Sequence, residues 1–196
     1  GPAPEIVMTP HIRAFIAIDL NETIKTSLEQ VQKTLASSEA DVKWTEKASL
    51  HMTLKFLGDI SPDQVEPIAE VMTRVVATTP KFSFDITELG AFPDILFPKI
   101  IWAGVGQNAE TLEGIARRLE EELLKLKIKK DERAFSAHIT LGRTRSTNGK
   151  DRLVAALEET NLPSGLSQAV GGITLFQSLL TPQGPVYTAL KNAPLK

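Results

Sequence analysis

Two copies of one short motif carry the residues best suited to chemistry in this chain. One copy reads HMTL from His51 and the other reads HITL from His138, and together they use two of the three histidines in the sequence. In an extended strand, residues i and i+2 point to the same face, so each motif presents an imidazole beside a threonine hydroxyl. Two such strands facing each other would line one groove with two imidazoles and two hydroxyls.

This set of groups suits phosphoryl chemistry. One imidazole can take a proton from an attacking water, and the other can give a proton to the leaving oxygen. The hydroxyls of Thr53 and Thr140 can donate to phosphate oxygens. Arg143 follows the second motif and adds a guanidinium, which is well suited to binding phosphate. Strict alternation would aim Arg143 at the opposite face, so we expect either a bulge near Gly142 or the end of the strand to redirect it.

A metal site is the main alternative explanation for paired histidines, because histidine is a common zinc ligand. Two ligands are too few, however, and neither motif has another His, Asp or Glu at the usual spacing. We therefore expect neither a metal nor another cofactor. A lone histidine on a strand is more often structural than catalytic, and His11 is most simply a solvated residue near the N-terminus.

The composition excludes several classes of protein. The chain has 196 residues, of which 42% are hydrophobic and 23% charged, as in a globular protein. It has no cysteine, which excludes disulfide frameworks, iron–sulfur clusters and cysteine nucleophiles. The net charge of −2 argues against non-specific binding of long nucleic acid. No apolar run approaches the ~20 residues of a membrane span, and we expect a cytoplasmic protein with no membrane partner.

The ends of the chain bear on its domain organisation. Gly1 and Pro2 look like a protease-cleavage scar, and Met8 is a plausible start, so we expect residues 1–7 to be a leader. Residues 8–196 then form a single domain with two similar halves, and nothing in them calls for more than a monomer. Strands are expected over residues 13–20, 42–44, 51–57, 82–86, 100–105, 135–143, 173–180 and 186–191.

Helices are expected between these strands. Apolar residues at helical spacing predict a first helix that follows an N-cap at Asn21 and runs to about residue 36, and further helices over residues 67–76, 112–126 and 151–157. Ser61 and Pro62 are expected to open the second helix, and its regular part is expected to begin only near Pro67, because proline removes a backbone donor. Residues 90–98 contain two prolines and are expected to form a loop.

The motifs and their surroundings resemble the 2H phosphoesterase superfamily. Within it they are most similar to the bacterial and archaeal RNA 2′,3′-cyclic phosphodiesterases, first described as 2′-5′ RNA ligases. The resemblance rests on HMTLKFLG from His51, HITLGR from His138 and the opening RAFIAIDL from Arg13, and it covers about residues 13–190. One departure is Ala137, which stands where members of the family often have proline.

The resemblance implies an α+β fold that is bilobal and pseudo-twofold, with two antiparallel sheets lining a central groove and helices outside. It implies metal-independent hydrolysis of an RNA-terminal 2′,3′-cyclic phosphate, or of a small cyclic nucleotide, to a 2′-phosphomonoester. In that reaction His51 would be the proton donor and His138 the proton acceptor. Thr53, Thr140 and Arg143 would bind the phosphate.

The sequence leaves other substrates and roles open. The same two imidazoles could act on 2′-5′ oligoadenylate or ADP-ribose cyclic phosphate, or could ligate RNA ends in the reverse reaction. A protein that only binds phosphorylated RNA ends is a further alternative, although binding alone needs no matched acid and base.

Several other residues are weaker candidates for the site. Lys55 either contacts phosphate or is a solvated charge at a strand end, and Arg133 matches a basic position of the family. Residues 117–152 hold eleven basic and six acidic side chains, which suits an approaching RNA end but also a helix that ends in lysines. Four aromatic residues could stack on a base or pack in the core: Phe15, Trp44, Phe92 and Tyr187.

Overall fold

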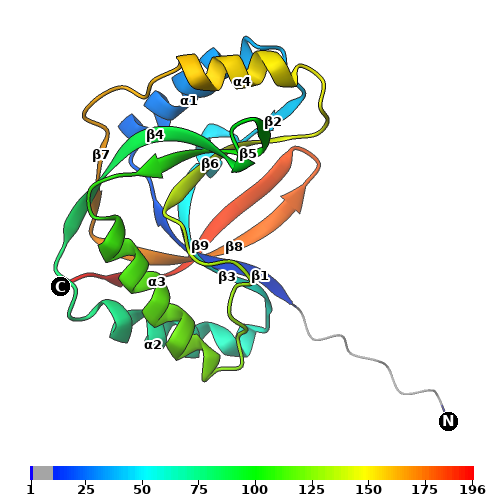
Figure 1. Cartoon of the computed structure of the whole chain (residues 1–196). Helices are drawn as coiled ribbons and strands as arrows, with labels where there is room; N and C mark the ends of the chain where they lie inside the picture. The colour runs from blue at the N-terminus through cyan, green and yellow to red at the C-terminus, as the bar shows by residue number, and fades with distance from the viewer. Residues whose placement is uncertain (2–10) are drawn as a thin grey trace.

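The computed structural model describes Gly1 and residues 11–196 (Figure 1). The expected start at Met8, and the expected leader apart from Gly1, lie outside the described residues. The strands are β1 (Ile12–Asp19), β2 (Val42–Trp44), β3 (His51–Ile60), β4 (Phe82–Asp94), β5 (Phe97–Val105), β6 (His138–Thr144), β7 (Ser167–Val170), β8 (Gly172–Thr181) and β9 (Gly184–Pro194). The α-helices are α1 (Glu22–Ala36), α2 (Val65–Val76), α3 (Ala109–Leu124) and α4 (Lys150–Glu159).

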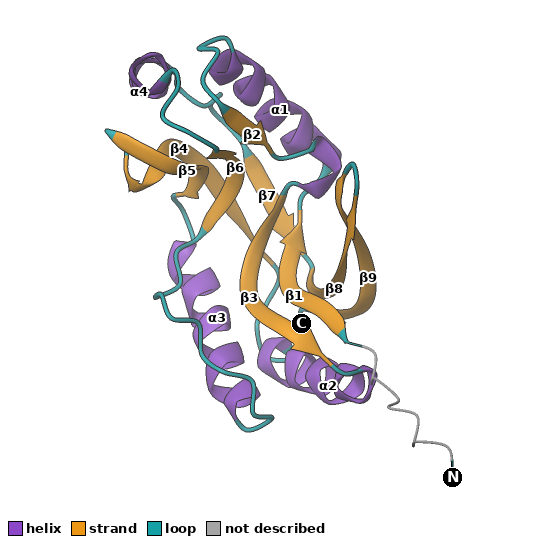
Figure 2. Ribbon diagram, turned by 90° about the vertical axis from the view of Figure 1, so that its right-hand side faces the viewer, coloured by secondary structure: helices purple, strands orange, loops and turns teal. Residues whose placement is uncertain are grey.

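The strands form two antiparallel sheets, each of which carries one motif. The first sheet has the order β3-β1-β8-β9 and the second has the order β2-β6-β5-β4-β7. β3 and β6 contact each other, which brings the two motif strands side by side. The helices lie outside the sheets in two pairs, α1 with α4 and α2 with α3 (Figure 2). The expected α+β fold with two antiparallel sheets is confirmed.

Local sequence signals explain where α1 begins and which face it buries. The side chain of Asn21 accepts a hydrogen bond from the Ile24 amide at 2.8 Å, which caps the helix N-terminus. Leu28, Val31 and Leu35 follow on the buried face. The predicted end at residue 36 is confirmed.

The predicted opening of this helix at Ser61 and Pro62 is confirmed, whereas its regular part, α2, begins two residues before the predicted Pro67. A 3₁₀ turn over Pro62–Gln64 leads directly into the helix at Val65, and Ser61 with Gln64 forms a capping box. Pro67 therefore lies in the first turn of the α-helix, where backbone N–H groups need no partner within the helix.

Residues 90–98, expected to be a loop, instead belong to a long hairpin of β4 and β5. Its turn is closed by the Asp94 carboxylate, which accepts from the amides of Leu96 and Phe97 at 2.8 and 3.1 Å. Pro93 pairs with Pro98 at an irregularity in the register, where neither strand needs a donor. The prolines therefore interrupt hydrogen bonding at one pair without ending the strands.

Other elements also differ from the prediction, most of them by one to three residues at their ends. β3 continues past residue 57 to Ile60, because Gly58 adopts a positive φ of 69° within the strand. β7, which has only four residues, was not predicted. The strand expected from residue 135 begins only at His138.

Candidate active site

Each motif histidine is the first residue of its strand and is held by the same hydrogen bond. The Nδ1 atom of His51 lies 2.7 Å from the carbonyl oxygen of Ser49, and that of His138 lies 2.7 Å from the carbonyl oxygen of Ser136. A carbonyl can only accept, so Nδ1 carries the proton in both neutral rings. The Nε2 atom of each ring is therefore the one that can exchange a proton with a substrate.

A serine two residues before each histidine belongs to the repeated unit. The sequence reads SLHMTL from Ser49 and SAHITL from Ser136, so the repeated unit extends two residues before each histidine. The ring contacts use the serine carbonyls rather than the hydroxyls. This contact, which orients the ring, could not be predicted from the sequence because every residue has a backbone carbonyl, whatever its type.

The threonine of the first motif is hydrogen bonded to its own histidine. Thr53 Oγ1 lies 2.8 Å from His51 Nε2, so a single bound group could contact both side chains. Thr53 and Thr140 are both half-buried, as are the histidines, whereas the residues between them are buried in the core. The predicted i, i+2 arrangement is present in both strands.

Each motif strand contains a β-bulge directly after its threonine. In β6 the register passes from Thr140 to Gly142 and skips Leu141, and in β3 it passes from Thr53 to Lys55 and skips Leu54. Of the two expected ways to redirect Arg143, the bulge near Gly142 is the one present. It leaves the residue after Gly142 exposed, although strict alternation would have buried that side chain in the core.

Arg143 is the exposed residue that follows the bulge of β6. Lys43 of β2 pairs with it on one side and Ile100 of β5 on the other. Gly142 permits the close approach of β2, since a Cβ atom there would lie 2.9 Å from side-chain atoms of Trp44 and Val42.

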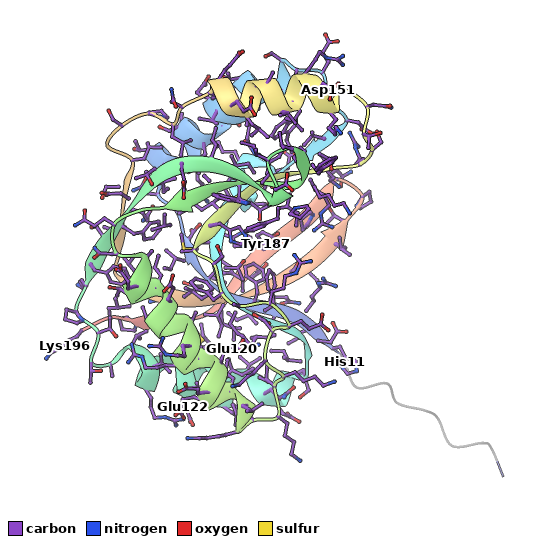
Figure 3. All side chains as sticks on the ribbon, in the orientation of Figure 1. His11, Glu120, Glu122, Asp151, Tyr187 and Lys196 are labelled. Atoms are coloured by element: carbon purple, nitrogen blue, oxygen red, sulfur yellow. The ribbon has the colours of Figure 1, made fainter. Side chains whose placement is uncertain are left out.

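Aromatic rings fix both imidazoles from the side, with nearly the same geometry. Tyr187 of β9 meets His51 edge-on, with ring centroids 5.2 Å apart at 88°, and Phe92 of β4 meets His138 at 5.2 Å and 88°. Figure 3 shows Tyr187 near the centre of the molecule, between the two sheets. Phe15 lies 4.8 Å from His51 and is buried. Three of the four aromatic candidates therefore orient the histidines.

Both interpretations of Lys55 are wrong. Its side chain is 1% exposed, because the bulge turns it away from the histidine face toward α3. Its ammonium contacts the carboxylates of Glu120 and Asp131 at 2.7 and 3.0 Å and donates to the carbonyl of Lys129 at 2.6 Å. Lys55 therefore ties the first motif strand to α3 and to the segment that leads to the second motif. Arg133, in the same segment, is exposed.

Burial lowers the pKa of both imidazoles below the ordinary value of 6.5. For His51, the Ser49 carbonyl and the charge of Asp19 oppose this lowering, whereas the charges of Lys25 and His138 add to it. The influence of His138 on His51 shows that the two motifs lie within electrostatic range. For His138, only the Ser136 carbonyl opposes the effect of burial.

Among the described residues, no three His, Asp or Glu side chains come together in a way that could hold a metal ion. No helix in the same part of the chain is long and apolar enough to span a membrane.

Comparison with known proteins finds relatives over almost the whole chain. The family model of LigT-like phosphoesterases matches residues 18–102 and again 104–187, so each match contains one motif. RNA 2′,3′-cyclic phosphodiesterases of Methanothermobacter thermautotrophicus and Thermotoga maritima are 33% and 32% identical, covering 92% and 91% of this chain and 97% and 93% of their own.

The fold of this chain is also similar to that of a solved structure. The crystal structure of E. coli LigT complexed with 3′-AMP superimposes with a TM-score of 0.80 at 25% identity, covering 95% of this chain and 99% of the other. Its fold, the two matches of the family model and the two equivalent His-x-Thr strands agree with one another. The chain belongs to the family of LigT-like phosphoesterases.

Proposed function

We propose that this enzyme hydrolyses the 2′,3′-cyclic phosphate at an RNA end to a 2′-phosphomonoester, without a metal ion. The observation that carries the proposal is the matched pair of imidazoles, each fixed by Nδ1 on a carbonyl and by an aromatic edge. This leaves two Nε2 atoms to supply the acid and the base that the reaction needs. The relatives named as RNA 2′,3′-cyclic phosphodiesterases support the same reaction.

In the proposed reaction, Nε2 of His138 takes a proton from water as the water oxygen attacks phosphorus. The bond between phosphorus and the 3′ oxygen breaks, and protonated Nε2 of His51 donates its proton to that oxygen. The products are a 2′-phosphate and a free 3′ hydroxyl. Thr53, Thr140 and Arg143 hold the phosphate oxygens, where hydrogen bonds from a guanidinium are charge-assisted.

One electrostatic contribution, the charge of Asp19, favours His51 rather than His138 as the proton donor, although burial and the charge of Lys25 oppose it. Asp19 pairs directly across from His51 in the β1–β3 ladder, and its negative charge favours the protonated ring. No acidic side chain among the described residues acts in this way on His138. A proton acceptor needs the neutral form, which burial without an acidic neighbour favours.

The lowered pKa values predict an acid-shifted pH profile. kcat/KM reports the ionisation of the free enzyme, and it requires His51 protonated and His138 neutral. As pH rises through the lowered pKa of His51 the donor is lost, so the alkaline limb is expected to begin below pH 6.5. Initial rates at low substrate concentration across the acidic and neutral range test this, and a maximum above pH 6.5 would contradict it.

Asp19→Asn serves as a matched control for the roles of the two rings. The substitution removes a charge that raises the pKa of His51 but does not act on His138. We expect the alkaline limb to move to still lower pH while the acid limb stays in place. Movement of the acid limb alone would mean that His51 has the lower of the two pKa values, which would contradict the assignment of the alkaline limb to His51.

The reaction itself is tested by incubating an RNA oligonucleotide that ends in a 2′,3′-cyclic phosphate with the enzyme in EDTA. We expect turnover at the same rate with and without the chelator. Loss of activity in EDTA would overturn the metal-independent mechanism. Turnover of 2′-5′ oligoadenylate or ADP-ribose cyclic phosphate in place of the RNA end would overturn the proposed substrate.

We also propose that residues 8–196 act as one bilobal domain, as a monomer in the cytoplasm. The double match of the family model to residues 18–102 and 104–187 supports two similar halves within one unit. Light scattering of the purified protein tests the monomer, since a mass of twice 21.4 kDa would contradict it.

A further inference from the structure

Gln32 is a polar residue of α1 that the fold buries. It is 6% exposed, although glutamine side chains mostly lie at protein surfaces. A buried amide needs hydrogen-bond partners, because leaving its polar atoms unpaired is costly. The partners of Gln32 therefore show which part of the fold it stabilises.

Both partners of Gln32 are backbone carbonyls beside the second motif. Its Nε2 atom donates to the carbonyl oxygens of Thr45 and Leu141, each at 2.8 Å. Leu141 is the residue that the register between β5 and β6 skips, and Thr45 is the first residue after β2. The Thr45 amide also donates to the Leu141 carbonyl, at 2.9 Å. This carbonyl therefore uses both of its lone pairs, and they tie the bulge to α1 and to the end of β2.

These hydrogen bonds hold the backbone at the point that decides where Arg143 is directed. An extra residue in a strand is left out of the ladder, so a bulge needs other contacts to keep its place. If the bulge moved by one residue along β6, the side chains that it passes would change face. Arg143 would then turn from the exposed side toward the core. Gln32 opposes this movement because it anchors Leu141 to a helix.

The first motif strand is secured in an equivalent way. α3 packs against β3, and its Glu120 carboxylate contacts the ammonium of Lys55, the residue that follows the β3 bulge. Glu120 stands eight residues after Leu112, the first buried apolar residue of α3. Gln32 likewise stands eight residues after Ile24, the first buried apolar residue of α1. Each half of the chain thus supplies a helix side chain that secures the motif strand of the other half.

We propose that Gln32 is a positioning residue for the phosphate site, because it holds the bulge of β6 that keeps Arg143 turned toward a bound phosphate. The inference rests on the proposed function, since it takes Arg143 to bind the phosphate. Gln32 acts only through the backbone of the bulge. Its loss is expected to leave both imidazoles in place, because the carbonyls of Ser49 and Ser136 hold them.

The test is the affinity for adenosine 2′-phosphate, measured by calorimetry. Gln32→Met has nearly the same size but no donor, and it is expected to weaken binding by about 2- to 10-fold, the net effect of one hydrogen bond. Arg143→Ala removes the guanidinium and is expected to weaken binding by about 10- to 150-fold.

The double variant of Gln32→Met and Arg143→Ala decides whether one residue acts through the other. It is expected to bind as Arg143→Ala does, because the position of the bulge no longer matters to the phosphate once the guanidinium is gone. Losses that add in full would overturn the proposal, and so would wild-type affinity in Gln32→Met.

Gln168→Met is the matched control. Gln168 is 5% exposed and also makes two backbone hydrogen bonds, accepting from the Asn21 amide and donating to the Ala169 carbonyl at 2.8 Å each. It lies in β7, at the opposite edge of the sheet from β2. Its variant is expected to keep the wild-type affinity. An equal loss of affinity in this control would attribute the effect of Gln32→Met to general destabilisation and refute the positioning role.

Hydrogen exchange follows the bulge itself, without a ligand. Gln32→Asn is a milder change, because it keeps the amide but shortens its reach, and it replaces Gln32→Met in every measurement if that variant does not fold. The Thr45 amide shares the Leu141 carbonyl with Gln32, so it is expected to exchange faster in the variant than in the wild type. Unchanged exchange at Thr45 would show that Gln32 does not hold the bulge.

Kinetics separate this proposal from the proposed function. With an RNA oligonucleotide that ends in a cyclic phosphate, Gln32→Met is expected to lower kcat/KM while both limbs of the pH profile stay in place. A shift of either limb would mean that the substitution disturbs an imidazole rather than Arg143, contrary to the proposal. If the wild type does not hydrolyse cyclic phosphate at all, the proposed function fails, and the affinities for adenosine 2′-phosphate still decide the role of Gln32.

Discussion

Alanine at either motif histidine is expected to lower kcat for hydrolysis of the cyclic phosphate by about 10²- to 10⁴-fold, the usual contribution of one positioned acid or base. His51→Ala removes the proton donor and His138→Ala removes the proton acceptor. Both rings are at least half-buried and lie at the edge of the core, so the fold of each variant must be verified by circular dichroism. Steady-state rates on a cyclic-ended oligonucleotide give the comparison.

His11→Ala is the control for this pair, because His11 is the third histidine of the chain and is exposed near the N-terminus. It is expected to have the rate of the wild type. The double variant at both motif histidines is expected to be little slower than the slower single variant, since groups that act in one step are not additive. Retention of full activity in either single variant would contradict the account.

Lys55→Ala is expected to reduce the free energy of unfolding by about 3–5 kcal/mol, the cost of removing one partner from a buried ion pair. The substitution leaves the Glu120 carboxylate without the ammonium that it contacts at 2.7 Å. The Lys129 carbonyl loses its donor as well. Urea denaturation followed by circular dichroism measures the change.

Two variants separate the contribution of the ion pair to stability from the contribution of side-chain packing. Lys55→Met keeps most of the side-chain volume, so it removes the charge contacts without a cavity and is expected to lose less stability than Lys55→Ala. Lys33→Ala breaks an exposed pair with Glu29 at 3.8 Å, which is expected to cost about 1 kcal/mol or less. A Lys55→Ala variant no less stable than Lys33→Ala would show that the buried contacts contribute little.

The candidate site could be predicted from the repeated motif because its reactive side chains, histidine and threonine, lie two residues apart in the sequence. The pairing of imidazole and hydroxyl on one strand face follows from the two-residue period alone. A bulge near Gly142 was one of two predicted ways, with the end of the strand, for Arg143 to share the phosphate. The equivalent bulge in β3 was missed, since no such requirement pointed to it, and the prediction for Lys55 failed for the same reason.

Contacts between distant residues set the limit of the sequence argument. The partners of Lys55 lie 65 and 76 residues further along the chain, on α3 and in the segment after it. The β4–β5 hairpin was missed because its two prolines face each other, which only the register shows. β7 has four residues, too few for a reliable alternating pattern, and it forms only because β4 offers an edge.

The identity of the product tests the central claim most directly. A 2′,3′-cyclic-ended RNA dinucleotide is hydrolysed by the wild type, and the product is resolved by phosphorus NMR against 2′- and 3′-phosphate standards. If His51 protonates the 3′ oxygen and His138 activates water, the product carries only a 2′-phosphate, and neither alanine variant accumulates it at a comparable rate. A 3′-phosphate product would contradict the assignment of the leaving oxygen, and an unchanged substrate would contradict the reaction.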